Sequence, residues 1–237
     1  MFFSLLFFLY TPLIPYSALM KSYCFASLSG TSDAIFYAPS LLGKSGKIGM
    51  SVTTLSYVPE LRIFSFSLSN KGSCIASSFM GTSDINEKSL FVGTTKHVEA
   101  CQAGFSIKLT EKSYEEINSK SLSILASLSN NSSEIIYGIA GLYELPGRKV
   151  NTTIFSSIRN SLGNIYFNLA FQGSLKIFSI AQDLTILPLI NFSIGLINNP
   201  KSYYLGFCIR NNIKPAVSFI YIPELGFATT CGIEYTY

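Results

Sequence analysis

Apolar and polar residues alternate along most of this chain, from about Lys47 to its last residue. Alternation with a period of two predicts β-strands, because successive side chains of a strand point to opposite faces. Pairs such as Asn130-Asn131, Pro146-Gly147 and Asn211-Asn212 interrupt the pattern and predict turns. The segments between turns hold about 9–11 residues, the length that a tilted strand needs to cross a bilayer. We therefore expect an all-β chain of about 12–14 antiparallel strands, with an even number.

The polar face of these strands distinguishes a membrane barrel from a soluble β-sandwich. A sheet face in water normally carries many charged side chains. Here the polar positions hold mostly Ser, Asn, Gly and Thr, and only 13% of the chain is charged, against roughly 25% in soluble domains. Small polar residues suit the interior of a narrow barrel. We favour a transmembrane antiparallel β-barrel whose first and last strands pair, with the sandwich as the alternative.

The alternation also predicts which side chains face the lipid and which face the lumen. A shift of one residue would invert a whole strand, so each strand tests the prediction separately. The side chains expected to point outward are Phe167, Phe171, Phe192, Phe207 and Phe227. Those expected to point inward are Asn168, Ser193, Gly195, Gly206 and Gly232.

The N-terminus has the pattern of a secretory signal peptide. An apolar run from Phe2 to Tyr10 is followed by Pro12, Pro15 and the small pair Ser17-Ala18. We expect cleavage near Ala18, so that residues 1–18 form the leader. A retained N-terminal anchor helix is the alternative, since no Lys or Arg precedes the apolar run.

Motifs for enzymatic, metal or nucleic-acid chemistry are absent from the sequence. The five cysteines contain no Cys-x-x-Cys pair, and His97 is the only histidine. We expect His97 to lie in a polar loop over residues 94–99 and the carboxylates near Glu111 to lie in another. The net charge of +4 comes from scattered Lys and Arg, without the basic stripe of a nucleic-acid-binding surface. No enzyme, cofactor or metal site is expected.

Three charged residues fall on predicted lumen faces: Lys108, Arg210 and Glu234. A charge facing lipid at mid-depth costs about 2–4 kcal/mol, so these side chains should point inward. They are candidates for contacting a ligand in the lumen. The simpler interpretation, which we prefer, is that they pair with one another or with Asp33.

Two regions resemble known outer-membrane barrels. The segment Ser27 to Gly43, which contains Asp33-Ala34-Ile35-Phe36-Tyr37 and Pro39, is similar to the N-terminal segment of FadL-type transporters and PorV/PorQ-like proteins. Ala38 departs from that family pattern, which usually has Asn before the Pro. Gln182 to Leu196 and Ile222 to Tyr235 are similar to the last strands of PorV/PorQ-like barrels.

The resemblance implies a plug inside a barrel of up to 14 strands. We expect residues 19–44 to form the plug and residues 45–237 to form the barrel. Phe36, Tyr37 and Pro39 would then be buried in the lumen. The small inward-facing residues would leave room for the two rings, which as an exposed leader would form a costly apolar patch.

The combined hypothesis is a protein of the bacterial outer membrane that contacts lipid and passes or binds small hydrophobic molecules. The alternative is an envelope barrel without transport, which acts as a structural part or as a component of a protein-secretion system. Its partners would then be other envelope or secretion proteins. Neither hypothesis involves nucleic acid.

Overall fold

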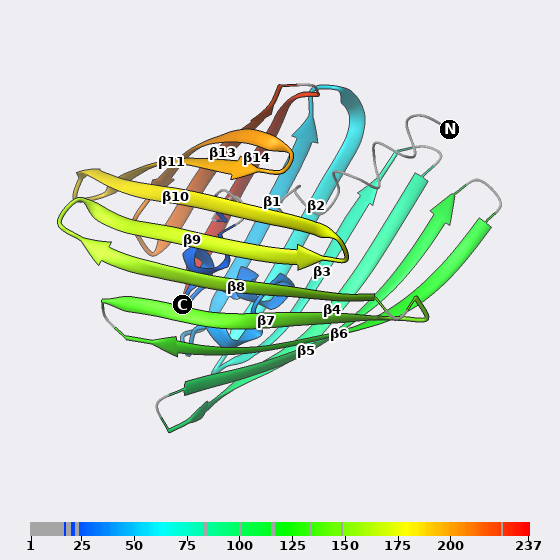
Figure 1. Cartoon of the computed structure of the whole chain (residues 1–237), viewed down its shortest axis with the longest axis horizontal. Helices are drawn as coiled ribbons and strands as arrows, with labels where there is room; N and C mark the ends of the chain where they lie inside the picture. Colours follow the sequence, from blue (N-terminus) through cyan, green and yellow to red (C-terminus); the bar gives the residue numbers. More distant parts are fainter. Residues whose placement is uncertain are drawn as a thin grey trace.

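The strands of this chain wrap around a short N-terminal segment in the computed structural model, which is drawn in Figure 1. The predicted leader at residues 1–18 lies outside the described residues, except for Ser17. The structure describes residues 17, 20–21, 24–82, 85–99, 101–114, 117–132, 134–147, 149–223 and 225–237.

In the described part of the chain, fourteen antiparallel strands close into one barrel, in which β1 pairs with β14. Each strand also pairs with its sequence neighbour, so the barrel is a continuous meander (Figure 1). Closure satisfies the edge groups that an open sheet would leave unpaired, and it rules out the β-sandwich. The strands are β1 (Lys47–Leu55), β2 (Val58–Asn70), β3 (Ser73–Gly81), β4 (Ile85–Val98), β5 (Cys101–Tyr114), β6 (Ile117–Asn131), β7 (Ile135–Leu145), β8 (Lys149–Asn160), β9 (Gly163–Gln172), β10 (Leu175–Leu187), β11 (Ile190–Asn198), β12 (Lys201–Ile209), β13 (Ile213–Ile222) and β14 (Gly226–Thr236).

The hairpin connections are short at both ends of the barrel. Between β2 and β3 the chain turns at Lys71 and Gly72, with φ values of 49° and 79°. Positive φ at both central residues is the geometry of the two-residue turn that matches the twist of paired strands, and glycine adopts it without strain.

We call the end of the barrel where β1 begins and β14 ends the terminal end, and we call the other end the opposite end.

Two predicted loops are in fact parts of strands. His97 lies in β4, and Thr110 to Tyr114 belong to β5, so the prediction of loops in these places was wrong. The register pairs Lys88 with Glu111 and Glu111 with Lys120 on neighbouring strands. Opposite charges across from one another stabilise paired strands, so the polar ends of β4, β5 and β6 continue the ladder beyond the apolar region.

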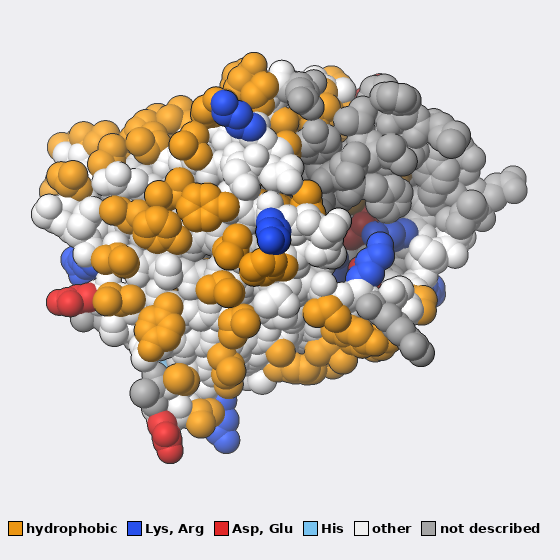
Figure 2. All heavy atoms as spheres, viewed as in Figure 1, with side chains coloured by type: hydrophobic (Ala, Val, Ile, Leu, Met, Phe, Trp, Pro, Cys, Tyr) orange, Lys and Arg blue, Asp and Glu red, His pale blue; other side chains and the backbone are white. Residues whose placement is uncertain are grey.

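The predicted facing of the strands is confirmed. Phe207 and Phe227 are exposed on the outer wall, and Phe167, Phe171 and Phe192 are partly exposed there. Asn168, Ser193 and Gly206 are buried, while Gly195 and Gly232 are half-buried at positions that alternate with exposed residues. Figure 2 shows hydrophobic side chains spread over the outer wall, with few charges among them. This exterior suits a hydrocarbon environment.

The N-terminal segment forms three short 3-10 helices: η2 (Phe25–Leu28), η3 (Ser32–Phe36) and η4 (Pro39–Leu41). They lie within the ring of strands, where Figure 1 shows them as blue coils. η2 contacts β8 and β9, η3 contacts β1 to β4, and η4 contacts β4 to β6. None of the helices in the described ranges is long and apolar enough to cross a membrane.

Candidate functional site

The interior of the barrel is the candidate site, because residues 24–42 lie there and almost all of them are buried. We call these residues the inner segment. Phe36 and Tyr37 are only 7% and 8% exposed. The Phe36 ring meets Phe91 of β4 edge to face at 4.9 Å, and the Tyr37 ring lies 5.3 Å from Phe25. Phe25 in turn packs against Phe155 of β8, so aromatic contacts join the segment to both β4 and β8.

Small polar side chains of the wall satisfy the irregular backbone of the inner segment. Ser127 Oγ accepts a hydrogen bond from Ser40 N at 2.8 Å, and Ser106 Oγ donates to Ile35 O at 3.5 Å. Asn168 Oδ1 accepts from Phe25 N at 3.5 Å. Non-helical backbone at membrane depth is tolerated only where protein groups or water satisfy it. The inward Ser and Asn positions therefore form the docking surface of this segment.

Two features of η4 bring it close to the wall. Pro39 begins the helix, where its missing N–H removes no helical hydrogen bond. Opposite it, β5 carries Gly104, and a Cβ atom there would lie 2.0 Å from Ser40 N and 2.2 Å from Pro39 C. Because both of these are backbone atoms, a larger residue at position 104 would displace either the helix or the strand.

Glu234 is the centre of a buried ionic network at the terminal end. Its side chain, on β14, is 0% exposed. It accepts hydrogen bonds from Lys47 Nζ at 3.0 Å and Lys214 Nζ at 3.4 Å, on the two strands that flank β14. Its other oxygen accepts from Ser32 N of the inner segment at 3.0 Å. One carboxylate thus joins three strands of the closure region to η3.

Asp33 lies beside this network but uses a different partner. Its carboxylate accepts a hydrogen bond from Ser67 Oγ at 2.5 Å, and Ser67 Oγ also lies 2.8 Å from Ser32 Oγ. Burial raises the pKa of Asp33 from its usual value of 3.8 to about 6. Of the described residues, Asp33 forms no direct ion pair with Lys108 or Arg210, although the sequence raised this pairing.

A second buried network, which the sequence analysis missed, holds the start of the described chain. Lys21 pairs with Asp183 of β10, which is 0% exposed. Asp183 also accepts from Tyr166 hydroxyl at 2.9 Å and from Ser193 Oγ at 2.8 Å. The signal available in the sequence was that the alternation of β10 places the carboxylate of Asp183 on the inward face. Its partner Lys21 lies 162 residues away and had no such signal.

Lys108 faces a cavity of about 250 Å³ at the opposite end. Its Nζ lies 3.6 Å from Glu87 and 5.4 Å from the centre of the Phe91 ring, and Lys112 also pairs with Glu87. Phe25, Phe36 and Tyr37 of the inner segment line the same cavity. This opposite-end cavity therefore combines an aromatic floor with a balanced set of charges.

Arg210 lies away from the other two candidate charges, next to two cavities at the terminal end. The larger of the two, which we call the terminal-end cavity, has a volume of about 630 Å³. It is lined mostly by polar residues, which include Ser27 and Ser29 of the inner segment. The inner segment thus presents its aromatic residues to the opposite-end cavity and hydroxyl groups to the terminal-end cavity. Lys108, Arg210 and Glu234, which the sequence grouped together, occupy three separate environments.

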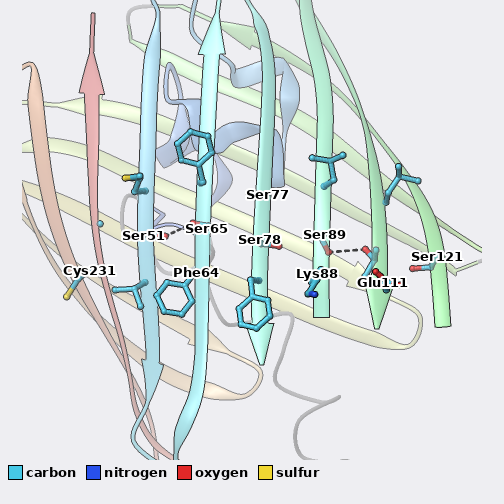
Figure 3. Close-up of a pocket in the computed structure, with 18 of the residues that line it drawn as sticks. Ser51, Phe64, Ser65, Ser77, Ser78, Lys88, Ser89, Glu111, Ser121 and Cys231 are labelled. Carbon is cyan, nitrogen blue, oxygen red and sulfur yellow. Dashed lines mark hydrogen bonds between the residues drawn. The ribbon is translucent and has the colours of Figure 1, made fainter. Parts of the chain in front are cut away.

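The outer wall carries a groove of about 1130 Å³ across β14 and β1 to β6 (Figure 3). Its walls include Phe64, Phe66 and Phe79, whose side chains point away from the lumen. Its lining also includes a row of small residues that the strand register places side by side. This row is Gly232, Ser51, Ser65, Ser78, Ser89, Thr110 and Ser121. The apolar walls suit acyl chains better than water.

Known structures resemble the whole barrel. No family model and no curated protein matches the chain. The KdgM porin superposes with a TM-score of 0.50 at 8% identity, over 81% of this chain and 99% of that chain. The Acinetobacter baumannii outer membrane protein Omp33 superposes with a TM-score of 0.58 at 6% identity, over 82% of this chain and 98% of that chain. At such identities the likeness establishes the fold, a porin-like closed barrel.

Proposed function

We propose that this protein is a bacterial outer-membrane β-barrel that conducts small molecules and that its inner segment is a plug. The observation that carries the proposal is the combination of an apolar outer wall with an interior in which residues 24–42 are buried. The barrels of similar fold include a porin and an outer membrane protein, which supports the same location for this chain. The expected plug region, residues 19–44, includes this segment.

The cavities at the two ends of the lumen favour different classes of solute. The aromatic floor of the opposite-end cavity supports the hypothesis that the barrel binds small hydrophobic or amphipathic molecules, because Phe25, Phe36 and Tyr37 offer apolar surface there. The polar terminal-end cavity favours a hydrophilic solute instead. The membership in the FadL or PorV/PorQ-like group, which the sequence raised, stays a hypothesis.

A role without transport has one observation in its favour. A buried ion pair of Lys21 with Asp183 holds the chain just before the inner segment, and a buried hydrogen bond from Ser32 N to Glu234 holds the segment itself. Plug residues tied in this way favour a permanently closed barrel. Such a barrel would serve as a structural part of the envelope or as a component of a secretion apparatus.

Uptake into liposomes tests the proposal. We expect low uptake of arabinose and of oleate through the intact protein. Uptake of at least one of them should rise about tenfold or more when residues 27–43 are deleted or when Phe36 and Tyr37 are both changed to Ala, because cavities then replace the buried rings. Phe64→Ala with Phe66→Ala, on the outer wall, is the matched control and should leave uptake unchanged.

Folding of each variant is checked by heat-modifiable migration on a gel. A folded deletion variant that stays impermeable to both solutes would overturn the channel proposal. Co-purification of a stoichiometric envelope protein with that impermeable barrel would favour the structural or secretion role.

A further inference from the structure

The terminal-end cavity has features of a ligand site that the plug proposal does not use. Its volume of about 630 Å³ is in the range of pockets that hold small molecules. Strands β7 to β10, the residue after β12 and the end of η2 all contribute to its lining. Most of the lining residues carry hydroxyl, amide or charged groups, and Ile136, Leu162 and Ala26 supply a small apolar part.

The cavity holds two arginines on inward positions of distant strands. Arg159 is near the end of β8 and Arg210 directly follows β12. Both line the cavity and both are exposed to it. Among the described residues every ion pair is formed by a lysine, so neither guanidinium is neutralised by a carboxylate at contact distance.

Two carboxylates at the terminal end already form ion pairs with lysines. Asp183 pairs with Lys21, and Glu234 pairs with Lys47 and Lys214. Glu134 is the one carboxylate that lines the cavity among the described residues. The terminal-end cavity is therefore positively charged, and its arginines present planar donor groups that match a carboxylate.

Amide and hydroxyl groups around the arginines add uncharged hydrogen-bonding capacity. Asn160 Oδ1 accepts from Leu162 N and Gly163 N, each at 2.9 Å, which leaves its amide N–H groups for another partner. Asn164 Nδ2 donates to the Tyr166 hydroxyl at 3.2 Å, which leaves its Oδ1 as an acceptor. Amide donors and acceptors of this kind suit a ligand that carries several hydroxyl groups.

We propose that the terminal-end cavity binds a small hydroxylated organic anion, of the sugar-acid class. Arg159 and Arg210 hold its carboxylate, and Asn160 and Asn164 bind its hydroxyl groups. The inference rests on the proposed function, since it names a solute for the same lumen. Binding to the cavity requires no passage, so it is measured independently of transport.

The test uses the purified full-length barrel in detergent, with D-glucuronate as the probe and calorimetric titration as the readout. We expect saturable binding at one site, weakened by added salt because the attraction is electrostatic. Arg159→Gln and Arg210→Gln should each reduce affinity about tenfold, the effect of one lost charge-assisted hydrogen bond. Arg62→Gln, on the outer face of β2, is the matched control and should leave affinity unchanged.

The proposal is overturned if glucuronate does not bind, if both arginine variants leave binding unaffected, or if glucose binds as tightly as glucuronate. Inorganic sulfate binding as tightly as glucuronate would reduce the cavity to a simple anion site and would also overturn it. If glucuronate does not bind but uptake rises when the plug is removed, only this inference is refuted. Binding without any uptake refutes only the channel.

Discussion

Individual side chains in this barrel owe their roles to partners on other strands. Glu234 has no special neighbours in sequence, yet three N–H donors surround its carboxylate in the closed barrel. A carboxylate that is 0% exposed is stable as an ion only when its lone pairs are satisfied in this way. Glu111, by contrast, pairs with Lys120 at 3.6 Å while both side chains stay more than half exposed. The same ion-pair chemistry has different consequences at these two positions.

At the residue scale we predict that Glu234→Gln lowers the free energy of unfolding by about 3–5 kcal/mol, because it leaves the buried Lys47 and the partly buried Lys214 without a counter-charge. Glu111→Gln is the matched control, and it should change that free energy by about 0–1 kcal/mol, as exposed pairs do. Urea unfolding of both variants in micelles measures the difference. Equal effects would mean that the Glu234 network contributes no more than a surface pair.

At the scale of elements, η4 and β5 meet backbone to backbone. Gly104 makes this possible, because a Cβ at this position would overlap the backbone of Pro39 and Ser40. In the sequence Gly104 is one polar-face residue among many in an alternating strand. Gly141 on β7 contrasts with it, because Gly141 lies on the outer face, where an added Cβ would meet nothing within 4 Å.

Gly104→Ala is expected to loosen the inner segment, since its Cβ would overlap two backbone atoms that cannot move independently. Overpacking of this kind costs about 1–3 kcal/mol. Hydrogen–deuterium exchange should become faster in peptides from residues 24–42 and stay unchanged in β9 to β13. Gly141→Ala should leave every peptide unchanged. If exchange in the inner segment is the same in the two variants, the close contact between η4 and β5 is not significant for docking.

At the scale of the whole molecule, the closed sheet gives the chain an apolar exterior and a filled interior. Phe207 is 44% exposed on the outer wall, whereas Phe155 is 1% exposed against the inner segment. The two rings would be in lipid and in protein, respectively, if the barrel spans a bilayer. The chain has no tryptophan, so a single introduced tryptophan reports its own surroundings without interference.

We predict that lipids brominated on their acyl chains quench the fluorescence of Phe207→Trp strongly and that of Phe155→Trp weakly. The reason is that only the outer position contacts acyl chains. Reconstituted vesicles with and without brominated lipid provide the measurement. Equal weak quenching of both variants would argue against a membrane-spanning barrel.

The sequence by itself determined the strands, their turns and the facing of their side chains. These are local properties, since a period of two and a turn residue act over a few positions. The inward position of Glu234 and the aromatic content of the inner segment were also readable. The ends of β4, β5 and β6 were not, because cross-strand pairs such as Glu111 with Lys120 extend them beyond the apolar pattern.

Only the tertiary structure decided which residues meet. Lys47 and Lys214 reach Glu234 because β1 and β13 flank β14 after closure, and Lys21 reaches Asp183 because the N-terminal segment lies inside the barrel. Arg159 and Arg210 line one cavity although β9, β10 and β11 separate β8 from β12 both along the chain and around the ring. Contacts across a lumen depend on strand number and register together, and neither is encoded in a short window of sequence.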